Sequence, residues 1–222
     1  MTGDIGLSWV AAQCDDLEDL PPEDLDCLVE RGPVAAMLRV TERAVAQLDS
    51  SAALQLGLDV QSLLRSPLPD GTIRTVWLGA TDHVFDPAKD DMDARTWLRK
   101  TEAAWLSAMR RTDPTFAPQV AADPGAEEEL QRAVLAAIGS VAGLLTNAAE
   151  RQIYPLPLRG LVPALEQVVT QVCADLGYRL FLRAMKAYFV EIDKKSHDAF
   201  IALGERFGYP KYLVGDGLNY RE

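Results

Sequence analysis

A row of basic side chains is the best-defined constellation in this sequence. Arg179, Arg183 and Lys186 are spaced i, i+4 and i+7, which places them along one face of a single α-helix. Such a row can bind an anionic ligand or an acidic partner, it can receive the protein's own acidic segment at residues 15–30, or it can be an ordinary solvated helix face. The apolar residues of the same segment are expected to point largely into the core: Phe181, Met185, Tyr188, Phe189 and Ile192.

Tyrosines gather in the last nineteen residues, GERFGYPKYLVGDGLNYRE. Gly208 stands where a left-handed helix C-cap is expected, and Pro210 prevents the helix from continuing. Disordered tails are depleted in aromatic and aliphatic residues, so we expect this tail to pack, either as a strap across the chain's own helices or on another molecule. Tyr209, Tyr212 and Tyr220 suit both roles. Together with the three basic residues they form the predicted partner- or ligand-binding set.

Catalytic signatures are missing from the sequence. Gly215-Asp216-Gly217 begins like a dinucleotide-binding pattern, but Tyr220 occupies the third glycine position. Cys173 lies among apolar residues, where burial raises a thiol pKa and lowers its reactivity. The acids most embedded in apolar segments, Glu150, Glu166 and Glu191, are equally explained as the polar edges of amphipathic helices. We therefore predict no catalytic residue and no cofactor.

Few side chains are available as metal ligands, because the chain contains only two histidines. A mononuclear site could use Asp82, His83 and Asp86, joined by Asp193 and His197 at i, i+4. The simpler interpretation is a polar turn at the first set and a surface pair at the second. We therefore predict no metal site.

Negative charge is concentrated at the start of the chain. The net charge is −11, and residues 1–30 carry nine acids and no base. This negative charge repels the phosphate backbone of a nucleic acid, and no basic stripe with interleaved aromatic residues is present. Nucleic-acid binding is therefore not expected. The first residues lack the basic n-region of a signal peptide, and the three cysteines form no close pair. These features favour a cytoplasmic location.

One long segment, residues 133–149, has no charged residue. It contains Gly139-x-x-x-Gly143, the spacing that lets membrane helices approach closely. A membrane span needs about 20 apolar residues, whereas this segment has 17 and includes Ser, Thr and Asn. We therefore predict a central core helix with a close-packed neighbour, and no membrane segment.

The apolar periodicity predicts a mainly α protein, an irregular bundle of about eight or nine helices. Residues 72–79, TIRTVWLG, are the exception, because Ile73, Val76 and Trp77 favour a strand and at most a small β-hairpin. Joints are expected at Gly177 and at residues 194–196. We predict one helical domain over residues 1–222, which can be subdivided into an acidic N-terminal half, 1–115, and a C-terminal core with a docked tail, 124–222.

These features favour a non-enzymatic protein of the bacterial cytosol that binds another protein or acts as a regulator. By analogy, immunity proteins, antitoxins and adaptor subunits are often acidic, cysteine-poor helical domains. The expected partner is a protein with a basic face, or a second copy of the chain. The alternative is an enzyme or small-molecule-binding protein with an anionic-ligand pocket between the C-terminal helices.

Overall fold

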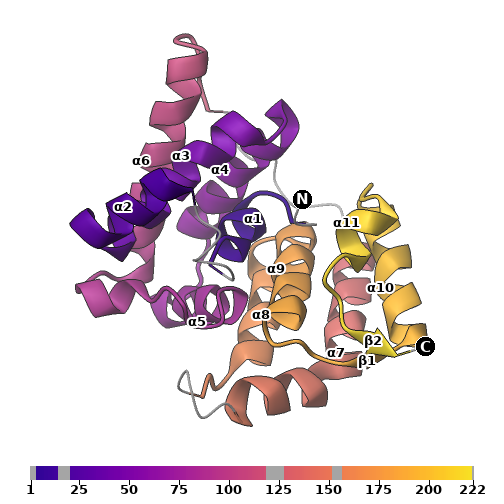
Figure 1. Cartoon of the computed structure of the whole chain (residues 1–222). Coiled ribbons are helices and arrows are strands. Elements are labelled where there is room, and N and C mark those ends of the chain that lie inside the picture. Colours follow the sequence, from indigo (N-terminus) through magenta and orange to yellow (C-terminus); the bar gives the residue numbers. More distant parts are fainter. Residues whose placement is uncertain (1–3, 15–20, 119–127, 152–156, 222) are drawn as a thin grey trace.

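The prediction of a mainly α protein is confirmed by a computed structural model, which describes residues 4–14, 21–118, 128–151 and 157–221 (Figure 1). These residues form eleven α-helices, nine of them with seven residues or more. The first part of the chain contains α1 (Leu7–Ala12), α2 (Pro22–Arg31), α3 (Pro33–Gln47), α4 (Ser50–Arg65), α5 (Asp70–Ala80), the 3-10 helix η2 (Pro87–Asp90) and α6 (Ala94–Thr112). The second part contains α7 (Glu128–Arg151), α8 (Leu161–Gln171), α9 (Ala174–Ala187), β1 (Ile192–Asp193), α10 (Lys194–Arg206), α11 (Lys211–Gly215) and β2 (Tyr220–Arg221).

Aspartates begin several of these helices. The carboxylates of Asp49, Asp93 and Asp193 accept hydrogen bonds from backbone N–H groups in the first turns of α4, α6 and α10. Each satisfies donors that have no partner within the helix. At the other end of α10, Gly208 has φ +81°, so the predicted left-handed C-cap is confirmed.

The predicted strand at residues 72–79 is wrong, because this segment lies within α5. Ile73, Val76, Trp77 and Ala80 follow the i, i+3, i+4, i+7 spacing of a helix face, and all four are buried. Burial of that face outweighs the β propensity of the individual residues. Among the described residues, β structure is confined to the short parallel pairing of β1 with β2.

α9 runs through the centre of the molecule (Figure 1). The N-terminal helices α1 and α5 pack on it from one side, and α7 and α8 pack on it from the other. All of its residues except Asp175 are buried. The joint predicted at Gly177 is wrong: α8 and α9 meet at Val172–Cys173, and Gly177 lies inside α9, where it allows close contact with Val169.

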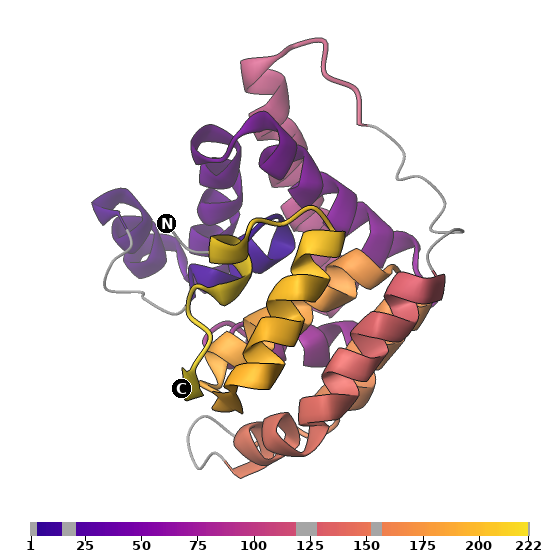
Figure 2. The same ribbon diagram turned by 90° about the vertical axis from the view of Figure 1, so that its right-hand side faces the viewer.

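The prediction that residues 133–149 form the central core helix is also wrong. These residues belong to α7, which lies along the outside of the molecule beside α10 (Figure 2). Only one stripe of α7 is buried, comprising Val134, Ile138, Val141, Leu145 and Ala149. The other faces carry mainly alanine, glycine and small polar residues, which offer little apolar area to bury. By length and composition, α7 is the one helix of the described residues that is apolar enough to cross a membrane.

Candidate functional site

The basic row of α9 is buried. Arg179 and Arg183 are each 3% exposed, and Lys186 is 7% exposed. The interpretation of this row as a solvated helix face is therefore wrong. Buried charges require partners, and the structure supplies them from three separate segments of the chain.

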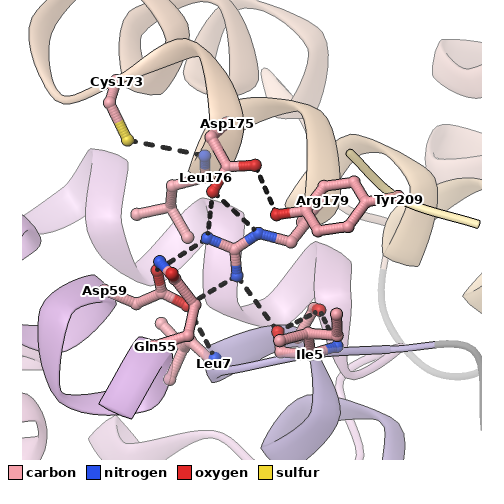
Figure 3. Close-up of polar contacts among 10 residues, drawn as sticks. Ile5, Leu7, Gln55, Asp59, Cys173, Asp175, Leu176, Arg179 and Tyr209 are labelled. Carbon is pink, nitrogen blue, oxygen red and sulfur yellow. Dashed lines mark hydrogen bonds and ion pairs between the residues drawn. The ribbon is translucent and has the colours of Figure 1, made fainter. Parts of the chain in front are cut away.

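Arg179 holds the centre of a buried ion-pair network (Figure 3). Its Nη1 and Nη2 atoms donate to the two carboxylate oxygens of Asp59 in α4, at 2.6 and 2.7 Å, and Nη2 also donates to Asp175 at 2.8 Å. Nη1 donates in addition to the backbone carbonyl of Ile5 at 3.0 Å, and the N–H of Leu7 donates to Asp59 at 2.9 Å. One guanidinium thereby joins the N-terminal segment, α4 and α9.

The C-terminal tail joins the same network. The hydroxyl of Tyr209 donates to Asp175 in a short hydrogen bond, and Gln55 donates to Asp59 (Figure 3). Burial raises the pKa of Tyr209, so its hydroxyl keeps its proton. Although burial lowers the pKa of Arg179, the charges of Asp59 and Asp175 raise it well above its ordinary value. Tyr209 therefore remains a hydrogen-bond donor and Arg179 remains a cation near neutral pH.

Arg183 and Lys186 lie next to a second buried acid, Asp4. The Asp4 oxygens are 3.8 Å from Arg183 Nη1 and 3.8 Å from Lys186 Nζ, while Arg183 Nε donates to the carbonyl of Ala80 at 2.9 Å. Burial raises the pKa of Asp4, with Lys186 and Arg183 acting in the opposite direction. Within the described residues, both ion pairs of Asp4 are therefore long.

The acids that reach the basic row differ from those expected. Residues 15–20 of the predicted docking segment lie outside the described residues. In the rest of that segment, Asp24 binds Arg39 and Arg43 of α3 rather than α9. Of the observed partners, Asp175 stands four residues before Arg179, a spacing visible in the sequence, whereas Asp59 and Asp4 are brought in by long-range folding.

A groove opens beside Asp4, with a volume of about 630 Å³. Asp4 and Trp9 line it from the N-terminal segment, Asp49 from the turn between α3 and α4, and Tyr212 from α11. None of its described lining residues is Lys or Arg. We call this hollow the Asp4 groove. It combines two carboxylates and two aromatic rings, a set suited to a cation with an apolar stem.

The three tyrosines of the predicted binding set lie in different places. Tyr209 is part of the Arg179 network, and Tyr212 lies at the Asp4 groove with 75% of its surface exposed. Tyr220 stacks on His197, with 4.0 Å between ring centroids, and belongs to β2. Val214 and Leu218 are buried, so the described part of the tail packs as a strap on its own chain.

The acids considered for acid–base chemistry do not line the Asp4 groove. Glu150 is exposed, Glu166 is half-buried, and Glu191 forms an exposed ion pair with Arg221. No group of three or more His, Cys, Asp or Glu side chains placed to hold a metal ion occurs among the described residues. Burial raises the pKa of Cys173 to about 11, as its apolar surroundings predict.

The loop after α5 has an unusual backbone. Asp82 and His83 both have positive φ, at +45° and +60°. Asp86 forms a bidentate ion pair with Arg74. Burial lowers the pKa of His83, so its ring is neutral near pH 7.

Phe189, which follows α9, was expected in the core. It has positive φ and is 76% exposed, so that expectation is wrong.

Comparisons with known proteins gave no match: no family model, no curated protein and no solved structure is significantly similar to this chain.

Proposed function

We propose that this protein is a non-enzymatic, cytosolic binding or regulatory protein that recognises another protein by inserting a basic side chain of that partner into the Asp4 groove. The observation that carries the proposal is the groove itself. It has the volume of a ligand site, it is lined by Asp4, Asp49, Trp9 and Tyr212, and its described lining contains no base.

The charges favour a cationic occupant. Asp216 adds a third carboxylate whose charge acts on Asp4, and the net charge of −11 attracts cations over a longer range. Lys186 and Arg183 lie behind Asp4 and offset part of its charge. Binding is therefore expected to weaken as the salt concentration rises.

The aromatic rings favour a cation carried on a side chain. Trp9 is 7% exposed and forms part of the floor, whereas Tyr212 is 75% exposed and free to cover an incoming group. The guanidinium of Arg43 already lies over the Trp9 ring, 6.0 Å from its centroid, so Tyr212 is the ring that remains for a ligand cation. A Lys or Arg side chain places its stem on such a ring and its charge at the carboxylate.

Peptide selection tests the proposal directly. A library of random peptides displayed on phage is selected on the full chain, and the recovered peptides are measured by titration calorimetry at low and high salt. We expect enrichment of Lys or Arg at one position, and at least about tenfold weaker binding to Asp4→Asn and to Tyr212→Ala, since each removes one favourable contact. Tyr220→Ala, an exposed tyrosine outside the groove, is the matched control and should bind normally.

Two outcomes would overturn the proposal. One is selection of peptides without a fixed basic position, and the other is binding that is unchanged by both groove variants. A parallel titration with spermidine and with arginine amide separates the sources of the cation: tight binding of these amines and none of the peptides would make the groove a small-molecule site.

The alternative of an anionic-ligand pocket between the C-terminal helices has less support. Arg179 is bound by two carboxylates, and Arg183 and Lys186 both lie at Asp4. An anion would have to displace these acids from a buried position.

A further inference from the structure

The turn that follows α9 carries a second feature, separate from the Asp4 groove. It is a Schellman motif, in which the N–H of Val190 donates to the carbonyl of Met185 at 3.0 Å. In the same motif the N–H of Phe189 donates to the carbonyl of Lys186, also at 3.0 Å. The residue that such a motif holds in the left-handed region is usually glycine. Here it is Phe189, with φ +47°.

α10 ends in the same motif with the usual residue. The N–H of Tyr209 donates to the carbonyl of Gly204 at 2.9 Å. The N–H of Gly208 donates to the carbonyl of Glu205 at 3.0 Å, and Gly208 has φ +81°. Glycine therefore occupies one of two equivalent positions and phenylalanine the other, which shows that the motif itself does not require an aromatic ring.

Phe189 also differs from the other residues that have positive φ. The remaining non-glycine residues of this kind in the described part of the chain are Asp82, His83 and Asp91. Aspartate and histidine adopt this conformation more readily than a bulky aromatic residue does. The left-handed backbone at Phe189 therefore costs free energy of folding, and something other than the turn must account for the phenylalanine.

Packing of the ring does not offset this cost. Phe189 is 76% exposed, whereas its neighbours Tyr188 and Val190 are 7% and 4% exposed. The backbone of the turn is nevertheless held in place, because Asn219 donates from Nδ2 to the carbonyl of Phe189 at 3.0 Å. An exposed aromatic ring on a fixed backbone is preorganised for binding, since little freedom remains to be lost when a partner covers it.

The two acids that follow Phe189 in the sequence are already used within the chain. Glu191 forms an ion pair with Arg221, and Asp193 accepts a hydrogen bond from the N–H of Ser196 as the cap of α10. The contact that Phe189 offers is therefore mainly apolar. A lipid surface suits it less well, because segments that lie on membranes combine apolar with basic residues, and anionic lipids repel a chain of net charge −11.

We propose that Phe189 is the anchor of a protein–protein contact, in which its ring enters an apolar pocket of a different protein. Burial of the ring in that pocket removes its apolar surface from water and offsets the cost of the turn. Because the contact is apolar, its affinity should change little with salt, unlike the binding expected at the Asp4 groove. The two surfaces do not share residues, so either proposal can fail alone.

Two substitutions separate the cost of the turn from the role of the ring. Phe189→Gly removes both the ring and the unfavourable backbone conformation, and it should raise the melting temperature by about 2–4 °C. Phe189→Ala is the matched control, because it removes the ring but keeps a side chain at positive φ, and it should gain little. A Phe189→Gly protein that melts at or below the temperature of the natural chain would overturn the proposal, since the ring would then serve the fold.

Photo-crosslinking in the cells from which the chain comes identifies the partner. Phe189 is replaced by p-benzoylphenylalanine in the full chain, and the protein that becomes linked to it is identified by mass spectrometry and then purified. Capture alone decides nothing, so the decisive measurement is titration calorimetry between the two pure proteins.

We expect Phe189→Gly and Phe189→Ala to weaken this binding by about thirtyfold or more, the loss typical of a central aromatic anchor. Affinities at low and high salt should differ by less than about threefold. Tyr212→Ala removes an equally exposed aromatic ring at the Asp4 groove. It is the matched control and should bind normally.

Any of four results would overturn the proposal. The first is the absence of a linked protein, and the second is a linked protein that binds Phe189→Gly as tightly as it binds the natural chain. The third is a link to a second copy of this chain, which would assign the ring to self-association. The fourth is flotation of the natural chain with phosphatidylcholine vesicles that is lost in Phe189→Gly, which would assign the ring to a lipid surface.

Discussion

α7 and α9 occupy places opposite to those that their sequences predict. α7 has no charged residue between positions 133 and 149, yet it lies on the surface, while α9 carries Arg179, Arg183 and Lys186 and lies in the centre (Figures 1 and 2). Whether charged side chains have partners, rather than whether a helix lacks charge, therefore decides which of the two helices is buried. α9 has large apolar side chains around its circumference, and its bases lie against acids: Asp59 and Asp175 at Arg179, and Asp4 at both Arg183 and Lys186. α7 has one apolar stripe and small residues elsewhere.

The two helices also differ in what a single substitution should do. In α9 each polar group is held by others in a water-poor environment, so removing one member leaves its partners buried and unpaired. On the outer side of α7, water replaces whatever is removed.

Arg179→Met should cost about 3–5 kcal/mol of the free energy of unfolding, because it leaves Asp59 2% exposed and without its main partner. Urea unfolding followed by circular dichroism measures this loss. The surface control Arg132→Met on α7 should change stability by no more than about 0.5 kcal/mol.

A compensating variant separates the loss of an ion pair from the loss of packing. Arg179→Met combined with Asp59→Leu removes both charges and should recover a large part of the stability, as replacing a whole buried pair by apolar side chains often does. An Arg179→Met protein as stable as the natural one would contradict the central role of the network.

Gly177→Ala in α9 should destabilise the protein by about 1–3 kcal/mol, the usual cost of overpacking a core. A Cβ atom there would lie 2.4 Å from Val169 Cγ2 and 3.0 Å from the Val169 backbone, so α8 or α9 would have to shift. Thermal unfolding measures the effect. Unchanged stability would show that α8 and α9 can separate slightly at this point.

The helices themselves could largely be predicted from the sequence. α2, α3, α4 and α6 begin close to the positions that prolines and aspartates mark, and Gly208 ends α10 as its position predicts. These features depend on neighbours within one or two turns. The strand predicted at residues 72–79 was wrong because the helix there depends on long-range contacts, namely burial against α8 and α9.

The candidate site could be predicted only in part. The spacing of Arg179, Arg183 and Lys186 correctly indicated one helix face, but their burial depends on Asp59 and Asp4, which lie 120 and more residues away in the sequence. No local pattern encodes that pairing. The Asp4 groove likewise combines the N-terminal segment, the α3–α4 turn and α11, three regions whose proximity follows only from the complete fold.

Gly139→Ala in α7 should stabilise the protein by about 0.5–1 kcal/mol, the reverse of the effect at Gly177. The position is helical and exposed, and nothing lies within 4 Å of an added Cβ. Alanine therefore contributes its higher helix propensity and meets no steric opposition. Thermal unfolding of both proteins at the same concentration measures the difference. A destabilised variant would mean that this face of α7 is already covered within one chain.

The smallest effect should be a change in the pH dependence of stability caused by Asp4. Burial raises the pKa of Asp4 in the folded chain, although Lys186, Arg183 and Arg179 act to lower it, while Asp216 raises it further. A carboxyl with a raised folded pKa favours folding most at low pH, and this contribution is lost as the pH rises through the folded pKa.

The stability of the natural chain relative to Asp4→Asn should therefore be greatest in acid and decline toward neutral pH. Urea unfolding of both proteins across this range gives the difference directly, because ionisable groups common to both largely cancel. A difference that grows as the pH rises would mean that attraction to Lys186 and Arg183 outweighs burial. In that case Asp4 would act mainly as an ion-pair partner of the α9 row.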